Sequence, residues 1–214
     1  MAIRAVVFDI GGVLEVTPDP QMREFNVRWE AQFGLRPGEL GERMARMEHL
    51  WRAGSLGECT EADVERGLCE IVGLSEEQVD AYMAGMWKEY VGTLNVALAD
   101  YFRGLRPRYL TGIISNSFVG AREREEALYH FSALADPIIY SHEVGIAKPD
   151  PRIYALTCER LGVQPAEMIF LDDSSGHIAA ARAFGIHGVV FHDNAQAIGE
   201  IEALLAAHNG EAQQ

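Results

Sequence analysis

The chain has 214 residues and carries 18 basic and 32 acidic side chains, which gives a formal net charge of −14 at pH 7. This length is sufficient to bury the core of one full domain with a smaller insertion. The negative charge disfavours nucleic acid and anionic membrane surfaces as partners, because both are themselves negatively charged.

The cysteines and the first residues are typical of a soluble cytoplasmic protein. Cys59, Cys69 and Cys158 form no CxxC pair, so we expect reduced, partly buried thiols. The N-terminal segment lacks the layout of a signal peptide, and no run reaches the roughly 18 apolar residues of a membrane-spanning helix. We therefore expect a cytoplasmic protein that is a monomer or a homodimer.

The first predicted strand leads directly into an acidic residue and two glycines. Residues Ala5–Phe8 are small, β-branched or aromatic, which is typical of a strand buried on both faces of a parallel sheet. Gly11 and Gly12 then permit a sharp turn. The carboxylate of Asp9 is thereby placed at the carboxyl end of a central strand, where open α/β sheets bind their ligands. Taken alone, the segment would also fit an aspartate that only caps a turn.

The segment that follows has the patterns of a separate helical domain. After a proline-rich turn at 17–20, apolar residues recur every three or four positions, which indicates amphipathic helices that end at glycines. Thr60 with Asp63 and Ser75 with Gln78 are predicted N-terminal capping boxes. Helices are expected at 21–33, 39–53, 61–72 and Glu76–Val91. Four helices without a strand, inserted after a first strand, indicate a lid domain whose apolar stripes form an ordinary bundle core.

The rest of the chain alternates between strands and helices. Strands are expected at 109–115, 137–140, 168–171 and 188–191, and helices at 95–105, 120–131, 151–161, 175–184 and 195–207. This alternation predicts an α/β fold with a Rossmann-like, doubly wound parallel sheet. We expect a core domain formed by 1–16 and 93–214, a helical cap at 17–92, and a frayed tail at 210–214.

Polar residues stand at or between the carboxyl ends of these strands. They are Asp9, Ser115, Asn116, Lys148, Asp172 and Asp173. In a parallel sheet these loops open on the same edge, so we expect three carboxylates, a hydroxyl and an ammonium of this set to converge on one pocket. Carboxylates a few ångströms apart repel each other by about 4 kcal/mol at an effective dielectric constant of about 20, so the cluster predicts a bound cation. An all-oxygen site favours Mg²⁺, and an aspartate beside Mg²⁺, a hydroxyl and an ammonium suits phosphoryl transfer.

These segments resemble the haloacid dehalogenase-like hydrolase superfamily over nearly the whole chain. The four motifs of that family are matched by residues 8–14 (FDIGGVL), 114–116 (ISN), 148–149 (KP) and 170–173 (FLDD). The helical insertion is similar to the family's α-helical cap. Within the superfamily, the chain looks closest to sugar-phosphate phosphatases and to the phosphatase domain of epoxide hydrolase.

The resemblance implies a Mg²⁺-dependent phosphomonoester hydrolase that acts on a small phosphorylated metabolite. Asp9 would be the nucleophile that forms an aspartyl-phosphate, with Ser115 and Lys148 assisting. The phosphate would be held by Gly12, Ser115, Asn116 and Lys148. The metal would be bound by Asp9, the Gly11 carbonyl, Asp172 and Asp173.

Three positions depart from the family pattern or add to it. Gly11 stands where a second aspartate usually acts as general acid and base, a contribution of about 10²–10⁴-fold, so we expect slow turnover of poor leaving groups. Glu15 is a candidate for the missing carboxylate, although exposure to solvent at the cap hinge is the simpler interpretation. His177 is either a partner of the aspartates or a histidine on the helix surface.

Two other functions stay open. In a 2-haloacid dehalogenase an aspartate attacks carbon without a metal, but enzymes of that type lack the paired aspartates that this chain keeps after its fourth strand. A catalytically impaired, phosphate-binding relative is the other alternative, because Gly11 replaces the usual second aspartate. We rank the phosphatase first.

Overall fold

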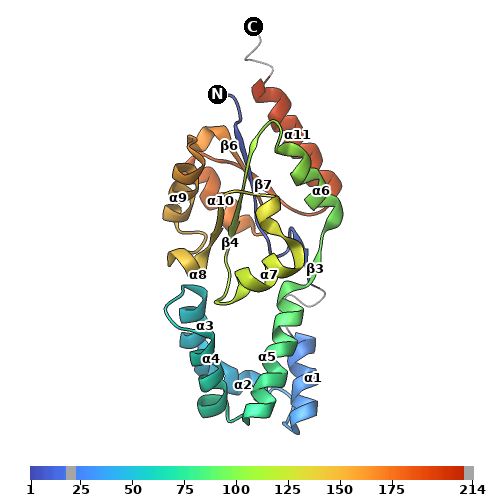
Figure 1. The fold of residues 1–214 in the computed structure, drawn as a ribbon, viewed down its shortest axis with the longest axis vertical. Coiled ribbons are helices and arrows are strands. Elements are labelled where there is room, and N and C mark those ends of the chain that lie inside the picture. The colour runs from blue at the N-terminus through green and yellow to red at the C-terminus, as the bar shows by residue number, and fades with distance from the viewer. Residues whose placement is uncertain (18–22, 210–214) are drawn as a thin grey trace.

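The computed structural model describes residues 1–17 and 23–209. Five parallel strands form the central sheet in the order β5-β4-β1-β6-β7, which confirms the predicted α/β fold with a doubly wound sheet (Figure 1). They are β1 (Ala5–Phe8), β4 (Leu110–Ser115), β5 (Ile138–Tyr140), β6 (Met168–Asp172) and β7 (His187–Val190). Each strand matches its predicted range closely, because uninterrupted apolar runs mark strands that are buried on both faces.

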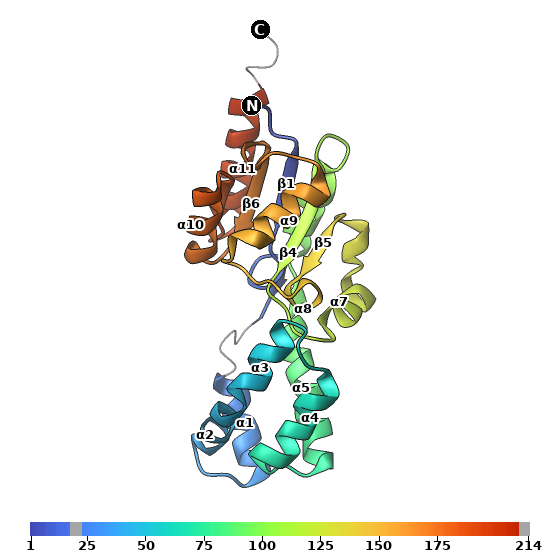
Figure 2. The ribbon, with the colours of Figure 1, turned by 90° about the vertical axis from the view of Figure 1, so that its left-hand side faces the viewer.

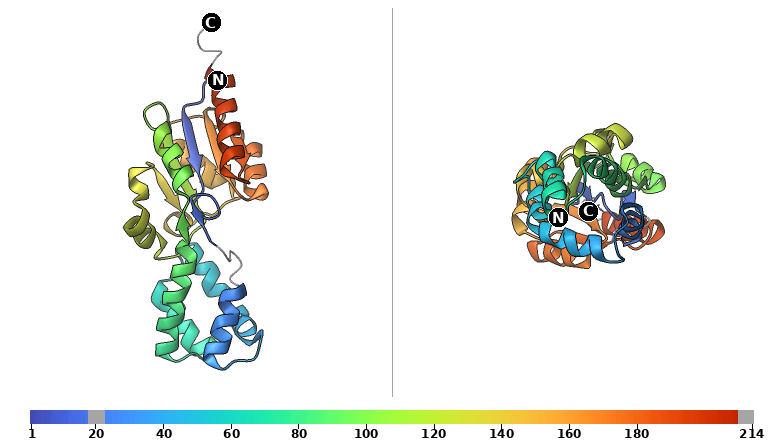
Figure 3. Two further views of the ribbon diagram at one scale, coloured as in Figure 1. Left: turned by 90° about the vertical axis from the view of Figure 1, so that its right-hand side faces the viewer. Right: turned by 90° about the horizontal axis from the view of Figure 1, so that it is seen from below.

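Helices cover both faces of this sheet. They are α6 (Val96–Leu105), α7 (Ala121–Tyr129), α8 (Ser141–Val144), α9 (Pro151–Leu161), α10 (Ser175–Phe184) and α11 (Asn194–Asn209). Val6 and Phe8 of β1 share an apolar cluster with α6 and α11 (Figure 3), and the Phe8 ring stacks on Phe102 with centroids 4.2 Å apart. Ala5 and Val7 share the opposite cluster with α9 and α10 (Figure 2). Alternate residues of the central strand thus connect two separate layers.

Helices between residues 23 and 91 form a second body, at the end of the molecule opposite to both termini (Figure 1). They are α1 (Arg23–Phe33), α2 (Glu39–Met44), α3 (Glu48–Ser55), α4 (Glu61–Gly67) with a π-helical turn (Leu68–Val72), and α5 (Glu76–Val91). Phe25, Leu40 and Leu68 belong to an apolar core of their own. Both predicted capping boxes, at Thr60 and Ser75, are confirmed. Within the described residues, no helix combines the length and the apolarity that crossing a membrane requires.

One predicted helix has the wrong bounds. The range 39–53 is divided into α2 and α3 by a 3₁₀ turn at Ala45–Met47, and α3 continues to Ser55. Gly54 therefore lies inside a helix and does not end it. A glycine is needed there for packing, since a Cβ atom would stand 2.2 Å from the Phe118 ring. The turn predicted at 17–20 lies mostly outside the described residues, and the tail 210–214 lies wholly outside them.

A short antiparallel ribbon, which the sequence did not predict, joins the two bodies. β2 (Glu15–Val16) pairs with β3 (Thr93–Leu94), and the backbone N–H of Asn95 donates to the Leu14 carbonyl over 2.8 Å. Strands of two residues are too short to show an alternating pattern, so sequence periodicity gives no sign of them. The ribbon holds side by side the two segments in which the chain passes between the core and the helical body.

Glu15 is buried at this ribbon, with 1% of its surface exposed, so the expectation of a solvent-facing residue is wrong. Its Oε1 atom has no hydrogen-bond partner among the described residues. Burial, together with the nearby Glu125 and Asp9 carboxylates, raises the pKa of Glu15 to about 10. The side chain is therefore a neutral carboxylic acid at pH 7.

We expect Glu15→Gln to stabilise the protein at alkaline pH. The pKa of Glu15 is raised from 4.5, so its contribution to stability is complete below about pH 4.5 and is lost as the pH rises toward 10. Each pH unit in that window costs about 1.4 kcal/mol for a single proton. Glutamine removes this loss. Thermal unfolding without added metal should therefore give a higher Tm for the variant at pH 8, and a smaller difference at pH 5.

Glu70→Gln, at an exposed position of the helical body, is the matched control and should leave the pH dependence of the Tm unchanged. Equal slopes of Tm against pH in the parent protein and in Glu15→Gln would show that Glu15 is ionised in the folded protein.

Candidate active site

The ammonium group of Lys148 connects the ends of two neighbouring strands. Asp9 follows β1 and Asp172 ends β6, and these strands pair in parallel, so both carboxylates lie at the same edge of the sheet. Lys148 Nζ is 2.7 Å from Asp9 Oδ1 and 2.7 Å from Asp172 Oδ2. All three residues are buried, with 6% or less of their surface exposed. Of the three acidic residues predicted to converge, Asp9 and Asp172 meet at this lysine.

Asp9 and Asp172 differ in how well their charges are compensated. Burial raises the pKa of Asp9 to about 7, although Lys148 and the Ile10 amide, which donates to Oδ1 over 2.8 Å, act in the opposite direction. Burial would also raise the pKa of Asp172, but His177 and Lys148 lower it to about 2. Asp172 is therefore an anion throughout the neutral range, whereas Asp9 titrates near neutral pH.

Both oxygens of Asp172 already have donors. Oδ1 accepts hydrogen bonds from the Ser174 amide at 2.8 Å and from His177 Nδ1 at 3.0 Å, and Oδ2 faces Lys148. Of the two interpretations of His177, contact with an aspartate is the one observed. Asp9, Asp172 and His177 offer ligand atoms within 4.8 Å of one another, yet the Lys148 ammonium already compensates this group. The geometry favours Asp172 as the support of Lys148 over its predicted role as a metal ligand.

The glycine turn after β1 brings the backbone close to Asp173. Gly12 has a φ of +75°, and a Cβ atom there would stand 2.3 Å from Asp173 Oδ2, so only glycine fits. Desolvation and the neighbouring Asp172 raise the pKa of Asp173. Gly11, Gly12, Asp173 and Ser115 all line one cavity of about 270 Å³, which we call the catalytic cavity.

Oxygen donors suited to a hard cation surround this turn. Asp9 and Asp173 offer carboxylates, and Gly11, which lines the catalytic cavity, offers a peptide carbonyl. Mg²⁺ prefers all-oxygen donor sets of this kind. The Asp173 carboxylate occupies the space that the methyl group of an alanine at position 12 would need. The residues present therefore fit Mg²⁺.

Asn116 anchors the loop that carries Lys148. Its Nδ2 donates to the Lys148 carbonyl over 2.8 Å, and the Lys148 backbone N–H donates to Asn116 Oδ1 over 2.7 Å. Lys148 Nζ also donates to the Ile114 carbonyl over 3.1 Å. These bonds fix the ammonium at the edge of the sheet. Asn116 and Ser115 also line the catalytic cavity.

Glu125 and Tyr90 are among the lining residues that the sequence did not indicate. Glu125 is buried on α7 and accepts a hydrogen bond of 2.5 Å from Tyr140 Oη. Burial raises the pKa of Glu125 to about 7, while the Tyr140 hydrogen bond acts in the opposite direction. One indication of this position was present in the sequence. Glu125 lies four residues after Ala121, which is buried, so both residues lie on the same face of α7.

Comparisons with known proteins identify relatives of this chain. The chain is 32% identical over 208 residues to mouse acyl-CoA dehydrogenase family member 10. The matched region covers 94% of this chain but only 19% of the mouse protein. It is 29% identical over 201 residues to (S)-2-haloacid dehalogenase 1 of Pseudomonas sp. strain CBS-3, covering 87% of the chain and 83% of that protein. It is 22% identical over 190 residues to a D-ribitol-5-phosphate phosphatase of Bacteroides thetaiotaomicron, covering 86% and 89%.

Solved structures share the fold. A HAD family enzyme from Bacteroides thetaiotaomicron, in complex with magnesium and inorganic phosphate, superposes with a TM-score of 0.73 at 22% identity, covering 89% of this chain and 95% of that one. A family model described as haloacid dehalogenase-like hydrolase matches residues 3–185. The chain therefore belongs to the haloacid dehalogenase-like hydrolase family.

Proposed function

We propose that this hydrolase is a Mg²⁺-dependent phosphatase that cleaves a small phosphorylated metabolite through an aspartyl-phosphate on Asp9. The observation that supports this most directly is the 2.7 Å contact between Asp9 and Lys148, beside a cavity lined by Ser115 and Asp173. The proposed nucleophile and the cation thus lie at the sheet edge where Ser115 and Asp173 line a space that can hold a phosphate group. The phosphatase relative and the neighbour bound to magnesium and phosphate support the same reaction.

The two oxygens of Asp9 have different roles in this reaction. Oδ1 accepts from both Lys148 and Ile10, so Oδ2 is the oxygen that attacks phosphorus. The bond between phosphorus and the alcohol oxygen breaks. Ser115 donates to a phosphoryl oxygen, and the nearby positive charge of Lys148 offsets the negative charge that accumulates there. Water then attacks the phosphorus, the bond to Asp9 breaks, and inorganic phosphate leaves with the Asp9 carboxylate restored.

The proposed metal position follows from the oxygen donors around the glycine turn after β1. Asp9, the Gly11 carbonyl and Asp173 would hold Mg²⁺, which when bound supplies positive charge to the phosphoryl oxygens. Asp172 orients Lys148 and does not enter this set.

A proton donor is needed because Gly11 cannot serve as one. Glu15 also lines the catalytic cavity and is protonated at neutral pH, since its pKa is raised to about 10. In this proposal Glu15 takes the place of the missing aspartate and protonates the leaving alcohol, and the Glu15 carboxylate then accepts a proton from the attacking water, which restores its neutral form.

A second candidate function is 2-haloacid dehalogenation. It is favoured by the ammonium of Lys148, which pairs with Asp9, and by the dehalogenase relative. An aspartate that attacks carbon needs no metal. The Asp173 carboxylate against Gly12 favours the phosphatase, because that carboxylate has a role only in the metal-dependent reaction.

The substrate and the metal requirement separate the candidate functions, and Asp9→Asn tests the nucleophile. We expect the parent protein to hydrolyse acetyl phosphate or p-nitrophenyl phosphate with Mg²⁺ and to lose this activity in EDTA. The variant should lose at least about 10³-fold in kcat, because the amide is not a nucleophile. Asp80→Asn, at an exposed position on α5, is the control and should retain full activity.

Chloride release from 2-chloropropionate without metal would establish the dehalogenase instead. Inactivity towards all these substrates, together with tight binding of a phosphate analogue, would establish the non-catalytic relative.

Gly12→Ala tests the contact with Asp173. The added methyl group would displace the carboxylate, so the Mg²⁺ concentration for half-maximal activity should rise by about 10- to 100-fold. Gly34→Ala is the matched control, because Gly34 has a φ of +68° and no atom within 4 Å of an added Cβ. Both variants should lose similar stability, since each places a side chain at positive φ. An equal requirement for Mg²⁺ in the two variants would show that Asp173 does not bind the metal.

A further inference from the structure

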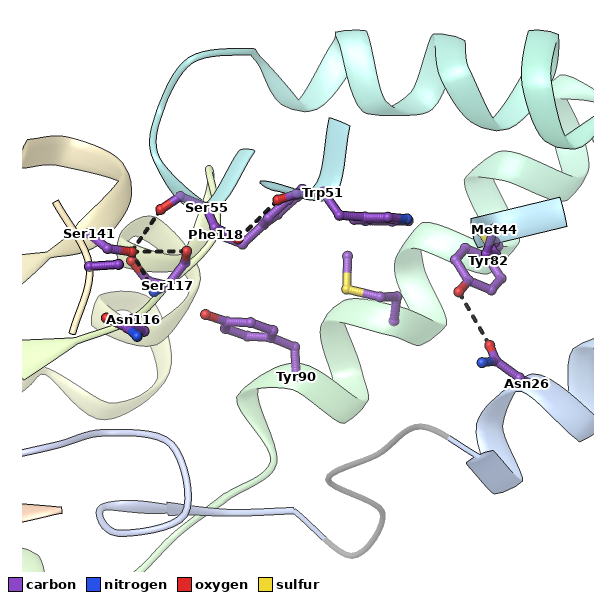
Figure 4. A pocket seen from close by; sticks show the side chains of 12 residues that line it. Asn26, Met44, Trp51, Ser55, Tyr82, Tyr90, Asn116, Ser117, Phe118 and Ser141 are labelled. Atoms are coloured by element: carbon purple, nitrogen blue, oxygen red, sulfur yellow. Dashed lines mark hydrogen bonds between the residues drawn. The ribbon is translucent and has the colours of Figure 1, made fainter. Parts of the chain in front are cut away.

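A second cavity, of about 460 Å³, lies between the helical body and the core and adjoins the catalytic cavity. Asn116 and Tyr90 line both cavities, so one molecule can extend from the first into the second beside these side chains. In Figure 4, Asn116, Ser117 and Ser141 lie at the core end, and Met44 and Tyr82 lie at the far end. We call this second space the leaving-group cavity.

Six of the twelve described residues that line the leaving-group cavity have aromatic or thioether side chains. These are Met44, Trp51, Tyr82, Met86, Tyr90 and Phe118. None of the described residues that line it carries a charge at pH 7. Trp51 and Phe118 hold each other with ring centroids 5.5 Å apart, and Phe118 also packs against Gly54. Both bodies of the protein therefore fix the shape of this apolar surface.

The polar groups at the core end have hydrogen-bond partners within the protein. Ser141 Oγ donates to the Ser55 carbonyl over 2.8 Å and accepts from the Ser117 amide over 2.9 Å. Ser117 Oγ lies 2.6 Å from His142 Nδ1. The side chain of Asn116 is committed to the backbone of Lys148. A hydroxyl-rich ligand would therefore find few free partners at this end.

We propose that the substrate is the phosphate ester of a predominantly apolar alcohol and not of a polyol or sugar. The proposal rests on the phosphatase activity proposed above, with the phosphate in the catalytic cavity and the alcohol in the leaving-group cavity. A hydroxyl buried without a partner opposes binding, whereas each buried methylene favours it. Aromatic and methionine walls provide the contact surface for such an alcohol.

The test is a series of n-alkyl phosphates from ethyl to octyl, assayed with the whole chain and Mg²⁺. We expect kcat/KM to rise by about two- to fourfold for each added methylene until the leaving-group cavity is filled. Hexyl phosphate and sorbitol 6-phosphate have the same number of carbon atoms and differ in their hydroxyl groups. We expect hexyl phosphate to be preferred by at least about tenfold.

Met44→Gln places an amide of similar size in the wall. We expect it to lower the ratio of kcat/KM for octyl phosphate to that for acetyl phosphate by about tenfold. Val27→Gln, at a position of the same helical body that is 63% exposed, is the control and should leave this ratio unchanged.

Failure of this inference is distinguishable from failure of the proposed function. Turnover of acetyl phosphate with a flat alkyl series, or with a preference for sorbitol 6-phosphate, would overturn the apolar substrate and leave the phosphatase in place. No Mg²⁺-dependent turnover of any phosphate, acetyl phosphate included, would overturn both.

Discussion

The site depends on one buried ammonium group placed between two buried carboxylates. A buried charge costs several kcal/mol unless it is paired and hydrogen-bonded, and Lys148 meets this condition for Asp9 and Asp172 together. The order of the sheet makes the pairing possible, because β1 and β6 are adjacent and parallel. Asn116 then fixes the lysine backbone, so the cation is held from both ends of the residue. Asp9 Oδ1 accepts hydrogen bonds from Lys148 and Ile10, and Asp9 Oδ2 is the oxygen that reacts in the proposed mechanism.

The position of the helical body depends on close contacts with the loops at the same sheet edge. Gly54 lets the Phe118 ring approach the helix, and its carbonyl accepts a hydrogen bond of 3.1 Å from the Val119 amide. On α4, Glu61 accepts hydrogen bonds from Arg124 of α7 at 2.8 Å and from Trp87 Nε1 at 2.6 Å. Contacts from two directions thus join the bodies, and the cavity between them has walls from both.

Sequence reasoning was strongest where a single physical rule dominates. Buried parallel strands need unbroken apolar runs, so all five strands of the main sheet were predicted, and so were the residues at their carboxyl ends. It was weakest where tertiary packing decides. The ribbon at β2 and β3 is too short for a pattern, Gly54 serves packing against Phe118, and the burial of Glu15 depends on how the two bodies meet. The sequence placed Lys148 near the aspartates, but its location between them follows only from the sheet order.

The electrostatics of the catalytic cavity bear on how an acidic protein could bind the proposed phosphorylated substrate. The whole chain carries a net charge of −14, and four acidic residues, Glu15, Glu89, Glu125 and Asp173, line the cavity that would receive a phosphate group. Burial raises the pKa of three of them, to about 10 for Glu15, to about 7 for Glu125 and upward for Asp173, so the cavity is less negative at neutral pH than its composition indicates. Glu89 pairs with Arg28 at 2.6 Å, and the charged carboxylate of Asp172 pairs with Lys148. The same burial that makes these groups costly to ionise thus lowers the repulsion that an incoming phosphate would meet.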